Sequence, residues 1–196
     1  MAQDYVDRNI DLVVIGGSAG SLDVVLKILP KLKPRARYAI IIVMHRKNTY
    51  DFSLSDLLGT KTSWQVVEAE EKQVVTPEHV YLAPADYHLL IENDHTLSLD
   101  VSEKVHYSRP SIDVTFESAA EVFRSKLAAV LLSGANEDGV DGLKKVQAHR
   151  GVTIVQDPST AAVAYMPQQA VNQLEVDIIA DPEELARIVS EIHGDL

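Results

Sequence analysis

The sequence predicts an α/β fold with a doubly wound, largely parallel sheet and helices on both faces. Short runs of apolar, β-branched residues alternate along the chain with stretches in which apolar residues recur at helical spacing. The run at residues 38–44 is apolar on both faces, which is typical of a buried parallel strand. Strand, helix and strand in this order favour a right-handed crossover, the repeating unit of such sheets.

The first strand–helix–strand unit lies at the start of the chain. Residues 10–15 form the first apolar run, and the apolar residues from Leu22 to Leu29 then follow the spacing of one helix face. Pro30 marks the end of this helix. The second strand, at residues 38–44, completes the unit.

The middle of the chain has a different pattern. Residues 79–83 form a further apolar run, and residues 87–91 and 96–101 flank a polar turn, as in a β-hairpin. Because a hairpin interrupts the parallel pattern, we expect it as an antiparallel element at one edge of the sheet.

The last third returns to alternation. Ser111 is a plausible N-cap for the helix that follows it. There is no repeat, low-complexity run or linker, so we expect a single domain over residues 1–196. The remaining predicted elements are helices over 112–127, 140–149 and 185–192 and strands over 128–132, 152–155 and 177–180.

Composition excludes several classes of function. The formal charge of −11 argues against nucleic acid or an anionic membrane as partner, because both need a basic surface. The absence of cysteine excludes thiolate metal sites and cysteine nucleophiles. The sequence has no signal-peptide pattern at its start and no apolar run of membrane-spanning length, so we expect a cytoplasmic protein that is not inserted in a membrane.

Three candidate catalytic residues follow three predicted strands. Ser18 lies in the turn Gly16–Ser21, His45 follows the second strand, and Asp138 follows the strand at 128–132. Because ligands of open α/β sheets bind at the carboxyl ends of strands, these side chains can converge. Ser18 would then be a nucleophile, His45 its base, and Asp138 the carboxylate that orients the imidazole. Backbone N–H groups of Ala19 and of the 134–136 turn can bind an oxyanion.

A second interpretation of the same turn remains open. A glycine-serine turn between a strand and a helix can also bind phosphate or carboxylate, without catalysis. However, residues 16–21 do not match the G-x-G-x-x-G pattern, and the second strand ends in His45 and not in the acidic residue that would bind a ribose. Arg109 is a tentative substrate-binding residue, and residues 156–167 form either a wall of the cleft or a structured loop.

Seven short motifs, most of them containing glycine, proline or serine, are spaced along the chain: Ile15–Ser21, Met44–His45, Pro77–Asp86, Arg109–Asp113, Leu132–Gly139, Val155–Pro158 and Tyr165–Pro167. In this order they resemble the catalytic domain of the chemotaxis protein-glutamate methylesterases of the CheB type. The resemblance covers nearly the whole chain, from residue 10 to residue 192. It implies a Rossmann-like methylesterase domain.

The resemblance also implies an activity. The family removes methyl groups from glutamate methyl esters of methyl-accepting chemoreceptors and releases methanol, and some members deamidate receptor glutamines. Its nucleophile, base and acid correspond to Ser18, His45 and Asp138. Its oxyanion donors, both backbone amides, correspond to Ala19 and Ala135, where the family usually has Thr and Met. No metal or cofactor is implied.

Two further expectations concern partners. The usual members carry a receiver domain before the catalytic domain, whereas only nine residues precede the first predicted strand, so we expect a stand-alone catalytic domain that a separate regulatory partner protein can control. Docking to acidic receptor helices needs a local basic patch, for which Arg46, Lys47 and Arg109 are candidates. The alternatives are a non-enzymatic phosphate- or carboxylate-binding module and a small-molecule carboxylesterase.

Overall fold

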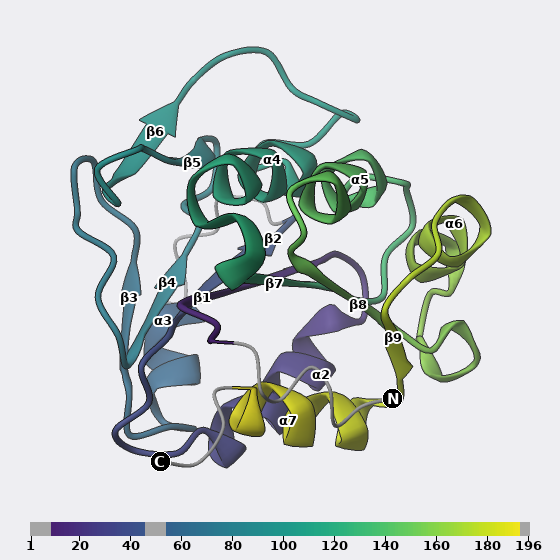
Figure 1. Ribbon diagram of the computed structural model, residues 1–196, viewed down its shortest axis with the longest axis horizontal. Coiled ribbons are helices and arrows are strands. Elements are labelled where there is room, and N and C mark those ends of the chain that lie inside the picture. The colour runs from purple at the N-terminus through teal and green to yellow at the C-terminus, as the bar shows by residue number, and fades with distance from the viewer. Residues whose placement is uncertain (1–8, 46–53, 193–196) are drawn as a thin grey trace.

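The computed structural model describes residues 9–45 and 54–192, and these residues form a seven-stranded sheet in the order β3-β4-β2-β1-β7-β8-β9 (Figure 1). Every neighbouring pair of strands is parallel, which confirms the predicted doubly wound sheet. The strands are β1 (Leu12–Gly17), β2 (Ala39–Met44), β3 (Gln65–Glu68), β4 (His79–Leu82), β7 (Leu127–Leu131), β8 (Val152–Gln156) and β9 (Ile178–Ala180).

Helices cover both faces of this sheet. In Figure 1, α4 and α5 lie above the sheet, whereas α2 and α7 lie below it. Among the helices of the described residues, none has both the length and the apolar content to cross a lipid bilayer. The helices are α2 (Ser21–Ile28), α3 (Leu54–Gly59), α4 (Ile112–Phe123), α5 (Val140–Ala148), α6 (Tyr165–Gln173) and α7 (Pro182–Glu191), with short 3-10 turns at Leu29–Lys31, Arg124–Lys126 and Pro158–Thr160.

The core has two halves, one on each face of the sheet. In β1, Val13 and Ile15 pack on the side of α2 and α7, whereas Leu12 and Val14 pack on the side of α4 and α5. This alternation follows from the two-residue period of a strand. Each of these side chains is at most 1% exposed, and burying one contributes about 1.5–3 kcal/mol. A strand buried on both faces explains the unbroken apolar run.

The predicted hairpin is present but does not extend the main sheet. Strands β5 (His88–Ile91) and β6 (Leu97–Asp100) pair antiparallel and form a separate two-stranded sheet, so the expected place at a sheet edge is wrong. The hairpin packs on α4, because the Thr115 hydroxyl donates to the Leu89 carbonyl at 2.7 Å and the Ile91 amide donates to Ser118. Its apolar face therefore covers a helix.

The order in which strands are added to the sheet reverses between β1 and β7, although the two strands are parallel. β2 lies on one side of β1, and β7 lies on the other. In doubly wound sheets this reversal opens a crevice at the carboxyl ends of the two central strands. The residues that follow β1, β2 and β7 are Ser18, His45 and the 132–139 loop, so the fold brings the three predicted catalytic positions to one edge of the sheet.

Candidate active site

Ser18 lies in a tight turn between β1 and α2. Its amide donates to the Ser133 carbonyl at 2.9 Å, and its carbonyl accepts from both the amide and the hydroxyl of Ser21. Gly20 has a φ of 81°, a left-handed conformation that glycine adopts without a steric penalty. A side chain at Gly134 would place its first carbon 3.1 Å from the Ser18 Cβ, so this glycine leaves room beside Ser18.

His45 and Asp138 form the first part of the predicted constellation. His45 follows β2, and its amide donates to the Gly17 carbonyl at 3.3 Å. Its Nε2 lies 2.7 Å from Oδ2 of Asp138. The imidazole is 13% exposed, whereas the carboxylate is fully buried. This geometry leaves Nδ1 as the ring nitrogen that can accept a proton from a substrate or nucleophile.

The Asp138 carboxylate is bound by the N-terminus of α4. The first amides of a helix have no partner within the helix, and they favour negative charge. Here the Ile112 amide donates to Oδ2 at 2.8 Å and the Asp113 amide donates to Oδ1 at 2.9 Å. The Ser111 hydroxyl adds a third bond, to Oδ1, at 2.8 Å. With His45, four donors surround one buried carboxylate.

These donors determine the charge of Asp138. Burial by itself raises the pKa of this carboxyl, but the hydrogen bonds from His45 and from the two α4 amides outweigh burial and hold the pKa below its ordinary value. Asp138 is therefore an anion at neutral pH. An anion in this position fixes the orientation of the His45 ring and stabilises its protonated form.

The link between Ser18 and His45 stays a prediction. Within residues 9–45 and 54–192, no hydrogen bond joins the Ser18 hydroxyl to the imidazole. The two residues are neighbours through the backbone, because Gly17 and Met44, which precede them, are register partners in β1 and β2. Catalytic hydrogen bonds of this kind are often long in unliganded enzymes and shorten when substrate binds.

The predicted oxyanion donors belong to two turns that meet at Ser18, because the Ser18 amide donates to the Ser133 carbonyl. Within the described part of the chain, neither the Ala19 amide nor the Ala135 amide has a hydrogen-bond acceptor. Both residues are exposed. The two segments are held together because the Ser133 hydroxyl donates to the Ala19 carbonyl at 2.7 Å. An oxyanion site requires free N–H groups that converge on one oxygen, and that convergence stays a prediction for Ala19 and Ala135.

Residues 157–166 pack along the same turn. The Val163 carbonyl accepts from the Gly134 amide, and the Met166 amide donates to the Gly134 carbonyl at 3.0 Å. The nearest atom to a side chain built at Gly20 would be Ala162 Cβ, at 2.5 Å. The sequence is compatible with either a wall of the cleft or a structured loop for this segment. In the structure the segment packs against the Ser18 and Gly134 turns.

The contacts of Arg109 are with its own loop. Its Nη1 donates to the carbonyls of Val101 and Ser102 at 2.6 and 2.7 Å, and its Nε is buried without a hydrogen-bond partner among the described residues. These bonds hold the 101–108 loop, and a contact with substrate stays a prediction. Arg46 and Lys47, the other members of the predicted basic patch, lie outside the described residues.

The structure adds residues that sequence reasoning did not assign to the site. Ser111 was expected only as a helix cap, and Ile112 only as an apolar helix residue, yet both donate to Asp138. The signal was present, because Ser111 begins a helix and Asp138 is a carboxylate in a loop. The pairing itself spans 27 residues and depends on the assembled fold.

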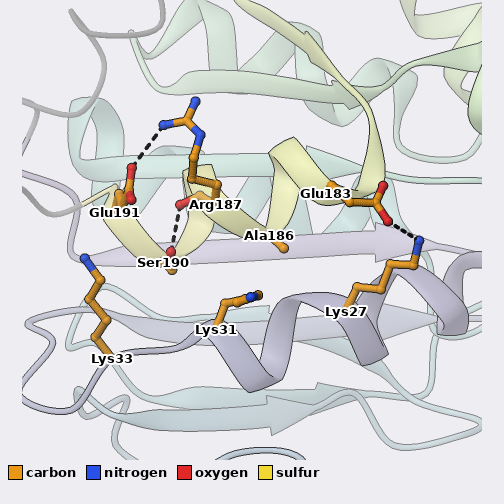
Figure 2. Close-up of a pocket in the computed structure, with 8 residues that line it drawn as sticks. All are labelled: Lys27, Lys31, Lys33, Glu183, Ala186, Arg187, Ser190 and Glu191. Carbon is orange, nitrogen blue, oxygen red and sulfur yellow. Dashed lines mark hydrogen bonds and ion pairs between the residues drawn. The ribbon is translucent and has the colours of Figure 1, made fainter.

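A separate groove lies on the face of the sheet opposite α4 and α5. Figure 2 shows that it runs between α2 and α7, with Lys27 and Lys31 on one side and Arg187 on the other. Its volume is about 670 Å³, and it contains none of the predicted site residues. Two of its cations are paired, because Lys27 contacts Glu183 and Arg187 contacts Glu191. It is therefore distinct from the candidate active site.

The family model, the relatives and the solved structure that match this chain all belong to one family. The family model described as CheB methylesterase matches residues 13–189. A putative protein-glutamate methylesterase/protein-glutamine glutaminase of Leptospira interrogans is 43% identical over 180 residues, which are 92% of this chain and 93% of that protein.

Longer relatives match over part of their length. The protein-glutamate methylesterase/protein-glutamine glutaminase of Thermotoga maritima is 35% identical over 188 residues, and the match spans 91% of this chain but 54% of that protein. The crystal structure of the Thermotoga maritima CheB methylesterase catalytic domain superposes with a TM-score of 0.88 at 32% identity. The superposition covers 93% of this chain and 98% of that domain.

Proposed function

Because this chain belongs to the CheB methylesterase family, we propose that it is a cytoplasmic serine hydrolase that demethylates glutamate methyl esters of chemoreceptors. Ser18 is the nucleophile, His45 the general base and Asp138 the orienting acid. The observation that carries this proposal is the His45–Asp138 hydrogen bond, at the carboxyl ends of β2 and β7 and beside the Ser18 turn.

The first half of the reaction forms an acyl-enzyme. The Ser18 hydroxyl oxygen attacks the carbonyl carbon of the ester, and its proton passes to Nδ1 of His45. The amides of Ala19 and Ala135 bind the negative oxygen of the tetrahedral intermediate. When the intermediate collapses, the methoxy group takes the proton from His45 and leaves as methanol.

The second half regenerates the enzyme. Water attacks the glutamyl ester on Ser18 while His45 accepts one of its protons, and this proton then returns to the serine oxygen as the glutamyl group leaves. The carboxylic acid that is released loses its remaining proton to solvent and becomes the glutamate carboxylate. A receptor glutamine follows the same sequence with ammonia as the leaving group. The buried Asp138 charge stabilises the imidazolium in both halves, because it remains unprotonated throughout.

The charge arrangement disfavours the binding-module alternative. A phosphate- or carboxylate-binding turn needs only the free amides around Ser18. It gives no role to an imidazole held at 2.7 Å by a fully buried carboxylate. That arrangement is what a general base requires, because the carboxylate fixes the ring and favours its protonated form.

Methanol release from a methylated chemoreceptor tests the proposal. We expect release by the wild-type chain and its loss in Ser18→Ala, whereas Ser190→Ala is the matched control because Ser190 lies on α7 and lines the separate groove, which contains none of the predicted site residues. A serine-directed phosphonate should label Ser18. Hydrolysis of small esters without methanol release would favour the small-molecule carboxylesterase. Phosphate binding without phosphonate labelling or hydrolysis would favour the binding module.

A further inference from the structure

A second carboxylate–imidazole pair lies beside the first. Asp113, in the first turn of α4, accepts at Oδ1 from the amides of Gly139 and Gly142, which are the N-terminal amides of α5. Its other oxygen, Oδ2, lies 3.2 Å from Nε2 of His106. The proposed reaction uses neither of these side chains, so this pair needs its own explanation.

The ligand-type atoms of three residues meet at this place. His106, Asp113 and Asp141 each offer an atom, and these atoms all lie within 4.8 Å of one another. They come from three elements, because His106 lies in the 101–108 loop, Asp113 in α4 and Asp141 in the first turn of α5. The separation of 3.2 Å between His106 and Asp113 is close to the roughly 3.3 Å between two ligands of a tetrahedral zinc ion.

We propose that His106, Asp113 and Asp141 form a binding site for a divalent metal ion of the zinc class. One imidazole nitrogen with two carboxylates suits Zn²⁺, whereas Mg²⁺ and Ca²⁺ prefer oxygen ligands alone. Three protein ligands leave one tetrahedral position for water. The site is outside the Ser18, His45 and Asp138 constellation, and the proposal does not depend on the hydrolase activity.

The surroundings of Asp113 support a bound cation. Its Oδ1 is saturated by two amides, which is how metal-binding carboxylates are usually held, and its Oδ2 stays available. Asp138 and Asp141 add negative charge nearby. Among the described residues, Lys144 is the one lysine or arginine paired with any of these three carboxylates, through Asp141.

The local backbone places His106 over this oxygen. Residues Val105 and Ser108 exchange two backbone hydrogen bonds, so His106 and Tyr107 occupy the centre of a tight turn. The His106 carbonyl also accepts from the Asn136 side chain at 3.4 Å. A metal ion here would join this turn to the first turns of α4 and α5. Its expected effect is therefore greater stability.

Isothermal titration calorimetry with ZnCl₂ on the full chain, after removal of metal with EDTA, tests the site. We expect one Zn²⁺ per chain, and a higher Tm with Zn²⁺ than with EDTA. Removing a ligand in Asp141→Asn or His106→Gln should lower the affinity by about 10- to 100-fold or more. Both residues are at the surface, so these variants should fold.

Matched controls separate this site from adventitious binding. Asp23→Asn changes an exposed aspartate in the first turn of α2, as Asp141 is in α5, and His149→Gln changes a histidine that is half-buried, as His106 is. Both should keep wild-type affinity. The proposal is overturned by the absence of a Zn²⁺-dependent rise in Tm, or by binding that survives in both ligand variants. Binding that is lost in His45→Ala and kept in Asp141→Asn overturns it as well.

Discussion

Two aspartates, Asp138 and Asp113, each lie at the start of one helix but accept hydrogen bonds from the first amides of the other. Asp138 directly precedes α5 but accepts from the first amides of α4, whereas Asp113 belongs to α4 but accepts from the first amides of α5. Each also contacts a histidine, His45 at 2.7 Å and His106 at 3.2 Å. The two carboxylates therefore have the same kind of partners and similar burial, at 0% and 8% exposed.

The pKa values of the two carboxyl groups nevertheless shift in opposite directions. The hydrogen bonds to Asp138 outweigh burial and lower its pKa. Burial, with a smaller contribution from the charge of Asp138, raises the pKa of Asp113 to about 6, against the hydrogen bond from the Gly142 amide. Hydrogen bonds from the N-terminal amides of a helix are therefore not sufficient to keep a buried carboxyl group ionised. The close imidazole, together with donors on both oxygens, keeps the Asp138 carboxylate charged.

Replacing the proposed base or nucleophile should cause the greatest loss of activity. His45→Ala should reduce methanol release by at least about 10⁴-fold, and Ser18→Ala by a similar factor, because both residues act in one proton transfer. The double variant should be little worse than either single variant. Losses that multiply would contradict a shared step. The same assay on His149→Gln provides the control.

Replacing each aspartate in turn should have different effects on kcat. Asp138→Asn should lower kcat by about 10²–10⁴-fold, because an amide in place of the carboxylate no longer stabilises the imidazolium and favours the wrong tautomer. Asp113→Asn should change kcat by less than about tenfold, since Asp113 contacts neither His45 nor Ser18. Steady-state kinetics with EDTA present measures both. Equal losses in the two variants would mean that the pairs act as one unit.

Stability should depend on pH with opposite signs at the two acids. The lowered pKa of Asp138 contributes stability above about pH 4, and this is lost as the pH falls and the carboxylate is protonated. The raised pKa of Asp113 contributes stability below about pH 4, and this is lost as the pH rises through about 6.

Urea unfolding from pH 4 to 7 in EDTA measures the second effect. From the low to the high end of this range, Asp113→Asn should gain of the order of 2–3 kcal/mol in free energy of unfolding relative to wild type. Asp94→Asn, at an exposed turn, is the control and should show no such gain. A constant difference between Asp113→Asn and wild type over this range would rule out a raised pKa.

Removing the Ser111 hydroxyl, which donates to Asp138 but not to Asp113, should have a smaller effect on activity. Ser111→Ala removes the hydroxyl bond to Asp138 and the cap of α4, so it should cost about 1–2 kcal/mol of stability. Activity should fall less than about tenfold, because His45 and two amides still hold the carboxylate. Chemical denaturation measures the loss. Ser190→Ala, with an exposed hydroxyl, should stay within about 0.5 kcal/mol of wild type.

Elements with a strong hydrophobic period could be predicted from the sequence, and those without one could not. The buried strands β1, β2, β7 and β8 were predicted to within a few residues because both of their faces are apolar. Strand β3 is half-exposed, and α6 carries Pro167 and four polar residues, so neither has a clear pattern. Helix α3 is only six residues long in the described part of the chain. The hairpin was predicted, but its packing on α4 was not.

For the candidate site, local sequence patterns predict which residue types follow which strands. They place Ser18, His45 and Asp138 at three strand ends, because local periodicity defines where strands stop. The hydrogen-bond partners of each side chain depend on the tertiary structure. His45 and Asp138 are 93 positions apart, and the α4 amides are 25 and 26 positions from Asp138. Such contacts arise when α4 and α5 pack on the sheet, and no local pattern encodes that packing.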